Sequence, residues 1–308
     1  MTLPSCIIGI DISKLWLDCF VQPAGKPTRF ANSPAGIAEL VAVAGPLGSF
    51  CVLEATGSYD AALVKALHAA GLAFHRANPR KARQFAQAAG FLAKTDRVDA
   101  RMLAAYGAGV ALRAEEPVAP EREDLKLLVG RRDHLVDLRK IERTRLAEAA
   151  ADWLAESFRA VIARLDEQIA QVESRIRQLL ATSELSRPNA ILRSGPGVGP
   201  VAASVLLALL PELGRRDRRA ISALAGLAPL AFESGAMRGQ RHIWGGRKRV
   251  RDALYMAALA ACRSGPFKPI CQAMRAGGKP AKLAIIAIAR QLLVALNAAL
   301  RDQKPFQA

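Results

Sequence analysis

Short apolar runs rich in β-branched residues alternate with polar turns along the first part of the chain. Residues 6–12 form one such run, which carries Asp11 near its end and is typical of a strand buried on both faces. Further strands are predicted at residues 16–21 and 28–31, with a turn at 23–25 between them. The chain is therefore predicted to open with an antiparallel three-stranded meander.

The pattern then changes to alternating helices and strands. Ser33 and Asn78 each precede a proline, a pairing that predicts a capped helix start. Strands are predicted at residues 50–54 and 73–76, and the helix between them is expected to stop at Gly71. Three strands followed by alternating helices and strands indicate an α/β domain.

Residues 121–181 have a helical composition, and their second half carries apolar residues at steps of four and three. This spacing predicts two long helices, packed on each other or on a second protomer as a coiled coil. An ordinary amphipathic helix facing the protein's own core is the alternative. The residues of this seam are Phe158, Ile162, Leu165, Ile169, Val172, Ile176 and Leu179.

Composition adds an expected class of partner to this outline. Of the 308 residues, 51% are hydrophobic and 23% are charged, as in globular proteins that bury a core. The length suits two domains and a connector. The net charge of +17, with a pI near 10.4, indicates nucleic acid as partner, because basic side chains placed on phosphates release counterions. A basic protein without such a partner is the alternative.

The excess positive charge lies in the C-terminal half. Residues 1–110 hold 11 basic and 7 acidic side chains, residues 111–186 hold 13 and 15, and residues 187–279 hold 16 and 4. Residues 186–189 include a proline and are predicted to interrupt the helical region, so the basic region is expected to begin there. Three regions of different electrostatic character are therefore predicted.

Cysteine and histidine positions indicate neither a zinc site nor a disulfide framework, because no Cys-x-x-Cys pair occurs and the histidines lie far apart. No secretory signal is recognised, so a cytoplasmic location is expected. Residues 281–300 are apolar enough for a membrane span. Because Lys282 and Arg290 interrupt them, a buried helix is expected and no membrane contact is predicted.

Four acidic residues stand where a sheet and a helix would bring them together. Asp11 and Glu54 end two predicted neighbouring strands, while Asp96 and Asp99 are three positions apart and so share a helix face. Clustered carboxylates repel each other unless a cation lies among them, and hard oxygen ligands suit Mg²⁺ or Mn²⁺. Two such ions about 4 Å apart can hold the attacking and leaving oxygens of a phosphodiester. A metal-dependent nuclease centre is predicted.

Each acid taken singly has a structural alternative. Asp99 would pair with Arg101 or Lys94, and Asp96 would cap the helix that starts there.

The glycines of the segment 194–200 predict a helix-hairpin-helix turn. Gly195, Gly197 and Gly199 would let backbone N–H groups approach a phosphate closely. Their spacing does not match the dinucleotide-binding fingerprint. A tight turn between two helices is the alternative.

The densest basic cluster follows Ser234, a serine next to a glycine. Guanidinium groups near a serine can bind a phosphodiester and stabilise charge in its transition state, which makes Ser234 a candidate nucleophile. Most serines near arginines only form hydrogen bonds, and Ser194 and Ser264 are weaker candidates. His242 is interpreted as a surface histidine in the basic patch, with a base or a phosphate ligand as the alternatives. The candidate nucleic-acid-binding residues here are Arg238, Arg241, Arg247, Lys248, Arg249 and Arg251.

Three strings of the N-terminal region resemble those of one enzyme family, the DEDD insertion-sequence transposases, which are similar to Piv-type DNA invertases and are also called bridge-RNA-guided recombinases. The resemblance covers nearly the whole chain. It implies an RNase H-like, RuvC-like fold at residues 1–115, a coiled-coil connector at 116–186 and a mainly α transposase domain at 187–308. The strings are Gly9-Ile10-Asp11-Ile12-Ser13-Lys14, Leu53-Glu54-Ala55-Thr56-Gly57 and Lys94-Thr95-Asp96-Arg97-Val98-Asp99-Ala100.

The family carries its nucleophile in a Ser-Gly element followed by a basic Trp-Gly-Gly segment, matched here by Ser234 and by Trp244-Gly245-Gly246. Relatives often have aspartate before the serine, where this chain has Glu233. The resemblance implies that Ser234 forms a phosphoserine link to DNA, while Asp11, Glu54, Asp96 and Asp99 hold the metal.

The resemblance further implies a noncoding guide RNA, a homo-oligomer (a dimer or tetramer) and association with the nucleoid. Alternatives are a RuvC-like junction nuclease or a Piv-like invertase without a guide. A DNA-binding protein without catalysis needs the basic half but not the four acids, so their presence argues against it.

Overall fold

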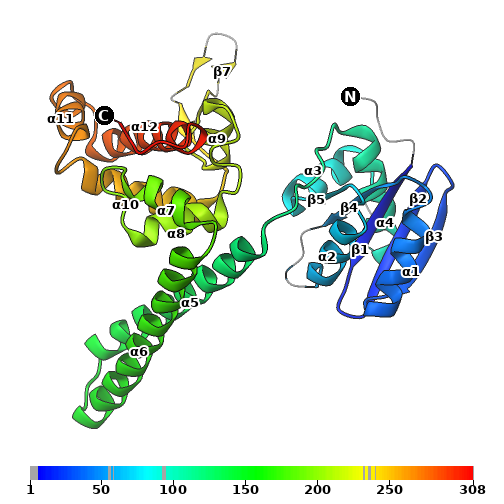
Figure 1. Cartoon of the computed structure of the whole chain (residues 1–308), viewed down its shortest axis with the longest axis horizontal. Helices are drawn as coiled ribbons and strands as arrows, with labels where there is room; N and C mark the ends of the chain where they lie inside the picture. The colour runs from blue at the N-terminus through cyan, green and yellow to red at the C-terminus, as the bar shows by residue number, and fades with distance from the viewer. Residues whose placement is uncertain are drawn as a thin grey trace. The chain divides into compact units, whose positions relative to one another are not determined.

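The computed structural model describes residues 6–54, 57, 59–91, 95–231, 233–234, 237–239 and 241–307, without the side chains of 96–97, 233–234 and 237–238. The chain divides into two compact units, Met1–Pro117 and Val118–Ala308. Figure 1 shows a sheet with helices in the first unit and an almost entirely helical second unit.

The first unit is built on a five-stranded sheet in the order β3-β2-β1-β4-β5. β1, β2 and β3 form the predicted antiparallel meander, whereas β4 and β5 run parallel to β1. The buried β-branched run of β1 places it at the centre of the sheet, where both of its faces are covered. The strands are β1 (Ile7–Ile12), β2 (Trp16–Gln22), β3 (Lys26–Ala31), β4 (Phe50–Glu54) and β5 (Phe74–Ala77).

Helices cover both faces of this sheet. Ile8, Ile10 and Leu53 pack under α1 and α2, while Ile7 and Val52 face α3 and α4. The predicted caps are confirmed, because Ser33 Oγ and Asn78 Oδ1 accept hydrogen bonds from the first turns of α1 and α3. The helices are α1 (Pro34–Ala44), α2 (Ala61–Ala69), α3 (Pro79–Ala88) and α4 (Asp96–Gly109).

The second unit begins with two long helices, α5 (Pro120–Ala147) and α6 (Asp152–Thr182), that pack on each other as a hairpin. Packing of the two helices on each other is one of the arrangements that the spacing predicts, and a coiled coil between protomers stays a prediction. The seam is buried at Ile169 and Ile176 and half-buried at its other positions. The hairpin thus buries its seam within the chain.

The other helices of the second unit form one hydrophobic core with the start of α5 and the end of α6. Among the described residues, α12 is the one helix long and apolar enough to cross a membrane. It packs on α10, and half of its apolar window is buried inside the unit, as expected of a core helix. The helices are α7 (Ser186–Arg193), α8 (Pro200–Leu209), α9 (Arg218–Leu224), α10 (Lys248–Ala261), α11 (Phe267–Ala276) and α12 (Ala281–Arg301).

A β-hairpin joins α9 to α10 and projects from the helices in Figure 1. Its base pairs β6 (Pro229–Leu230) with β9 (His242–Ile243), and its outer part pairs β7 (Glu233–Ser234) with β8 (Met237–Arg238).

Candidate active site and nucleic-acid surface

Asp11 and Glu54 are neighbours at one edge of the sheet. Ile10 of β1 is paired with Leu53 of the parallel strand β4, so the next residues along the two strands stand side by side. Both carboxylate side chains are half-buried. Because side chains alternate between the faces of a strand, Asp11 shares its face with Gly9, and Glu54 shares that face with Val52.

α4 crosses this face and brings its first turn toward the same edge. A methyl group at Gly107 would touch Ile7 and Val52, and one at Gly9 would overlap the α4 backbone at Ala100 and Ala104. From Ile7 to Gly9 along β1, the contacts therefore step back along α4 toward its N-terminus. Continued for two residues, this antiparallel course leads from Gly9 to Asp11 and from Ala100 to the first turn of α4.

The first turn of α4 contains Asp96 and Asp99. Thr95 Oγ1 caps the helix by accepting a hydrogen bond from Val98 N at 3.4 Å, so the cap is Thr95 and not Asp96 as the structural alternative had it. Asp99 is half-buried, and the side chain of Asp96 lies outside the described residues.

The donor set at this edge suits a hard divalent cation, since it consists of carboxylates from β1, β4 and α4. Among the described side chains, which leave out Asp96, no three Asp, Glu, His or Cys residues are close enough to hold a metal ion. The fold thus explains why these acids share one edge, while metal binding by the four residues stays a prediction.

Sequence reasoning missed Asp18. It pairs directly with Asp11 across β1 and β2, so the two side chains share a face of the sheet. Asp18 is only 5% exposed, and Arg29 binds both of its oxygens, with Nε and Nη2 each at 2.9 Å. Arg29 also lies over the ring of Trp16. The signal in the sequence was an acid within an otherwise apolar strand.

The glycine turn between α7 and α8 is partly used for packing. A side chain at Gly195 would meet Leu296 of α12, and one at Gly197 would overlap the α10 backbone at Ala257. These two glycines therefore allow close approach of helices within the unit, as the alternative of a tight turn requires. Gly199, the N-cap of α8, has open space around it, so phosphate contact is expected there first.

Several members of the predicted basic cluster are engaged inside the unit. Arg247 forms two hydrogen bonds with Glu212, at 2.6 and 2.7 Å, and Arg249 pairs with Asp133 of α5. Arg251 donates to the carbonyl oxygens of Gly226 and Gly245. Three arginines that were expected to face DNA thus also stabilise the fold. The cluster therefore offers fewer free guanidinium groups to DNA than its sequence predicts.

Lys248 and Arg241 are exposed. Lys248 forms a surface ion pair with Asp252 at 2.7 Å. The side chain of Arg238 lies outside the described residues.

Ser234 lies in the outer part of the projecting β-hairpin, paired with Met237. Its side chain lies outside the described residues. His242 is exposed and pairs with Leu230 at the base. Four residues of extended chain span roughly 13 Å, so His242 and Ser234 stand at different levels of the hairpin. The position of His242 favours its interpretation as a surface residue.

Ser194 is held in the fold, because its Oγ donates to Ile191 O at 2.6 Å and accepts from Phe306 N at 2.8 Å. Ser264 is exposed in the turn after α10.

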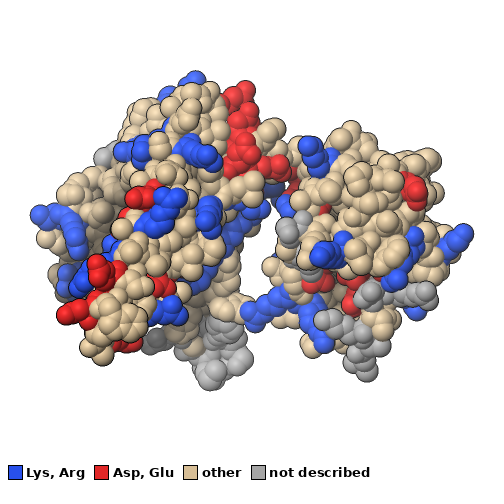
Figure 2. Space-filling view, turned by 90° about the horizontal axis from the view of Figure 1, so that it is seen from below, with Lys and Arg blue, Asp and Glu red and all other residues tan. Residues whose placement is uncertain are grey.

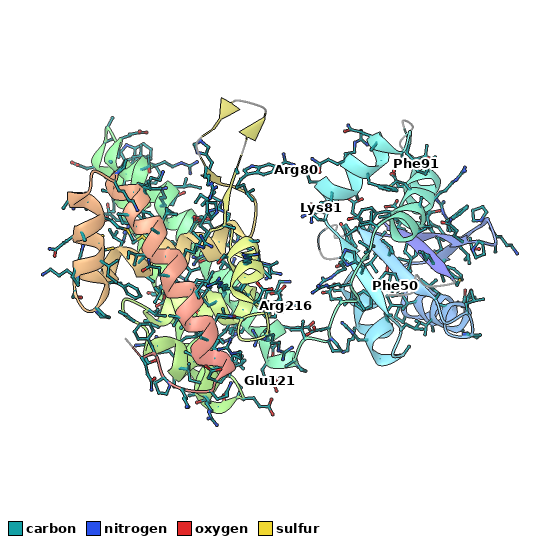
Figure 3. All side chains as sticks on the ribbon, turned by 90° about the horizontal axis from the view of Figure 1, so that it is seen from above. Phe50, Arg80, Lys81, Phe91, Glu121 and Arg216 are labelled. Atoms are coloured by element: carbon teal, nitrogen blue, oxygen red, sulfur yellow. The ribbon has the colours of Figure 1, made fainter. Side chains whose placement is uncertain are left out.

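A second basic surface was missed at the start of α9, where the sequence Arg215-Arg216-Asp217-Arg218-Arg219 would have been the signal. Asp217 Oδ1 caps α9 by accepting from Ala220 N and Arg219 N, and these backbone hydrogen bonds lower the pKa of its carboxyl. Arg218 and Arg219 are exposed, and Arg216 is labelled in Figure 3. Figure 2 shows basic side chains spread over the visible face of this unit, with acidic ones between them.

In the first unit, Arg80 and Lys81 are exposed in the first turn of α3 and extend outward from it (Figure 3).

Comparison with known proteins decides the family. Residues 8–158 match a DEDD transposase family, and residues 189–272 match the Transposase IS116/IS110/IS902 family. The pilin gene-inverting proteins of Moraxella lacunata and Moraxella bovis are each 30% identical over 97% of both chains. The chain belongs to the IS110/IS116 transposase family.

A further relative is an uncharacterized 44.8 kDa protein of insertion element IS116 from Streptomyces clavuligerus, 32% identical over 46% of this chain and 36% of its own. As a member of the IS110/IS116 family, the protein is an enzyme of DNA recombination and acts on DNA. Its DEDD domain implies use of a divalent metal ion, typically Mg²⁺.

Proposed function

We propose that this transposase moves an insertion element by cutting and rejoining DNA strands, with four acids and one serine as its catalytic groups. The observation that carries the proposal is the parallel pairing of β1 with β4 under α4, which gathers Asp11, Glu54 and the first turn of α4 at one edge. Asp11, Glu54, Asp96 and Asp99 would hold Mg²⁺ or Mn²⁺. The bound metal would neutralise phosphate charge and polarise the scissile phosphodiester.

Ser234 is the proposed nucleophile of the basic region at residues 187–308. Its Oγ attacks the phosphorus of a DNA phosphodiester, the bond from phosphorus to one sugar oxygen breaks, and that oxygen takes up a proton from water and leaves as a hydroxyl. The hydroxyl proton of Ser234 is released to a base. The phosphoserine link keeps the energy of the broken bond, so a second strand end can reverse the reaction and be joined.

A covalent adduct tests this chemistry. Labelled DNA incubated with Mg²⁺ and the protein is expected to yield a protein–DNA band that survives denaturant. Ser234→Ala should abolish the band, while Ser264→Ala, a serine exposed in another turn of the same unit, should retain it. Cleavage by Ser234→Ala without any adduct would favour a RuvC-like junction nuclease instead.

Asp11→Asn and Glu54→Gln test the acids, since each keeps the size of the side chain and removes its charge. Both are expected to lower cleavage at least about a hundredfold while DNA binding through the basic unit persists. Binding without cleavage in the unaltered protein would indicate a DNA-binding protein without catalysis.

DNA inversion is a second candidate outcome, favoured by the whole-chain similarity to the two Moraxella pilin gene-inverting proteins. A plasmid that carries the element's ends in inverted orientation would report inversion, and one with a separate target would report transposition.

Guidance by a noncoding bridge RNA is proposed on the family resemblance and on the excess of basic residues at 187–279. In such a division of labour, base pairing reads sequence and the protein reads backbone and shape. RNA extracted from the purified protein and sequenced should be dominated by a transcript from the element's own flank. The proposal also includes a dimer or tetramer associated with the nucleoid, which sedimentation of the purified protein on its own and with DNA would test.

A further inference from the structure

A cavity of about 370 Å³ opens in the second unit between α5, α6, α7 and α8. This volume lies in the range of pockets that hold one small ligand. Part of its lining is apolar, from Ile176, Leu180 and Val201, and part is polar. It adjoins the start of α8, where Gly199 forms the open end of the glycine turn.

One polar group of the lining lacks a partner. Asn189 Oδ1 is buried, and within the described structure it accepts no hydrogen bond. A buried acceptor left without a donor costs about 1–3 kcal/mol. A ligand that presents an N–H group in the cavity would remove this cost.

The cavity also offers positive charge. Arg177 and Arg193 line it and are exposed, and neither forms a hydrogen bond or ion pair with another described residue. The third arginine, Arg132, is already held by Glu173, whose Oε1 accepts from its Nε at 2.8 Å. Two guanidinium groups therefore remain for an anion, and phosphate is one of the two anions, with carboxylate, whose geometry matches the guanidinium fork.

A nucleotide has a part for each of these features, because its phosphate carries negative charge, its base has N–H donors and the faces of the base are apolar. We infer that the cavity receives one unpaired nucleotide of a DNA strand. Arg177 and Arg193 bind its phosphate, the base packs on Ile176, Leu180 and Val201, and a base N–H donates to Asn189 Oδ1. The inference rests on the proposed function, since it assigns a step of DNA handling to residues outside the proposed catalytic set.

A DNA duplex with a single bulged 2-aminopurine tests the inference. This base fluoresces weakly when stacked, and no described lining residue is aromatic, so its emission should rise on binding. The protein is also expected to bind the bulged duplex about five- to tenfold more tightly than the same duplex without the bulge. Asn189→Ala should remove most of the rise, and Arg177→Ala with Arg193→Ala should remove the preference for the bulge.

Arg175→Ala is the matched control, because Arg175 is an exposed arginine of α6 that does not line the cavity. It should leave both the emission and the preference unchanged. The wild-type protein alone already decides part of the question, since equal affinity for bulged and intact duplexes, or unchanged emission, overturns the inference without any variant. So does a rise in emission that survives all three cavity substitutions.

Binding of free 2-aminopurine nucleoside monophosphate shows whether the cavity takes a nucleotide that is part of a DNA strand or a free nucleotide. The free monophosphate should bind at least about a hundredfold more weakly than the bulged duplex, and equal affinity would overturn the assignment to a DNA strand. The adduct assay on the same protein keeps the two proposals apart. An adduct without any emission change rejects the cavity site alone, whereas an emission change without an adduct rejects the serine chemistry alone.

Discussion

The missing side chain at Gly9 determines how closely α4 approaches the sheet and, with it, the place of Asp11. Gly9→Ala should destabilise the fold by about 3 kcal/mol, because the added methyl group overlaps the α4 backbone at Ala100 and Ala104, which cannot move as a side chain can. Denaturant unfolding of the full chain measures this loss.

Gly130→Ala is the matched control for that substitution. Gly130 lies inside α5 with open space around it, so alanine there should stabilise the helix by about 1 kcal/mol. Equal effects of the two substitutions would contradict the close contact between β1 and α4.

Asp18 and Arg29 give a second prediction for single residues. Arg29→Ala leaves the buried Asp18 carboxylate without the two hydrogen bonds that Arg29 donates, which should cost about 2 kcal/mol of unfolding free energy. Arg164→Ala, which breaks an exposed ion pair with Glu167, should change it by less than about 0.5 kcal/mol. If denaturant unfolding gave the same loss of stability for both variants, the buried pair of Asp18 and Arg29 would contribute no more to the fold than an exposed ion pair.

At the scale of elements, Arg247 connects the junction of β9 and α10 to the segment after α8, because its guanidinium donates two hydrogen bonds to Glu212. Burial alone would raise the pKa of Glu212, but the hydrogen bonds and charge of Arg247 outweigh it, so the pKa lies below its ordinary value of 4.5. A carboxyl with a lowered pKa stabilises the fold above its unfolded pKa, and this contribution is lost as the pH falls through the folded value.

Glu212→Gln should therefore reduce stability near neutral pH and matter little in acid. The free-energy difference between wild type and Glu212→Gln is expected to shrink as the pH falls below the ordinary glutamate pKa of 4.5. Thermal melting across this range measures it. A constant difference would show that the Glu212 charge does not contribute.

The sequence predicted elements better than contacts. β1 and β4 were placed within one residue because buried strands are marked by continuous apolar, β-branched runs, and the Ser33 and Asn78 caps have a local signature. The antiparallel course of α4 over Gly9 was not predictable, since it depends on backbone contact between distant segments. The pairing of Arg249 with Asp133 joins residues 116 positions apart, and no local pattern distinguishes such an arginine from one that faces DNA.

The candidate site divides in the same way. Asp11 and Glu54 could be predicted because each ends an apolar strand. Asp18 has a signal as an acid within an apolar strand, but its burial and its pairing with Arg29 depend on residues outside that strand and could not be predicted. The cavity at Asn189 was missed because it forms only when the four successive helices α5 to α8 pack together, and no local pattern marks that packing.

For the whole molecule, the net charge of +17 makes DNA affinity depend steeply on salt. Each phosphate contact contributes about 0.9 to the slope of log affinity against log salt concentration. Arg218→Ala combined with Arg219→Ala should therefore lower that slope by about 2. Arg301 is an exposed arginine paired with Asp302, and Arg301→Ala should leave the slope unchanged. An equal slope for wild type, the double variant and Arg301→Ala would show that Arg218 and Arg219 do not contact DNA.

The hairpin of α5 and α6 has a mechanical consequence. One end of it is built into the core of the second unit, while Trp153 near the other end is 73% exposed. The 31 residues of α6 form a rod roughly 46 Å long. Tilting such a rod by about 5° displaces its tip by roughly 4 Å. A partner molecule that binds at the tip and tilts the hairpin would thus also displace the parts of α5 and α6 that line the cavity at Asn189.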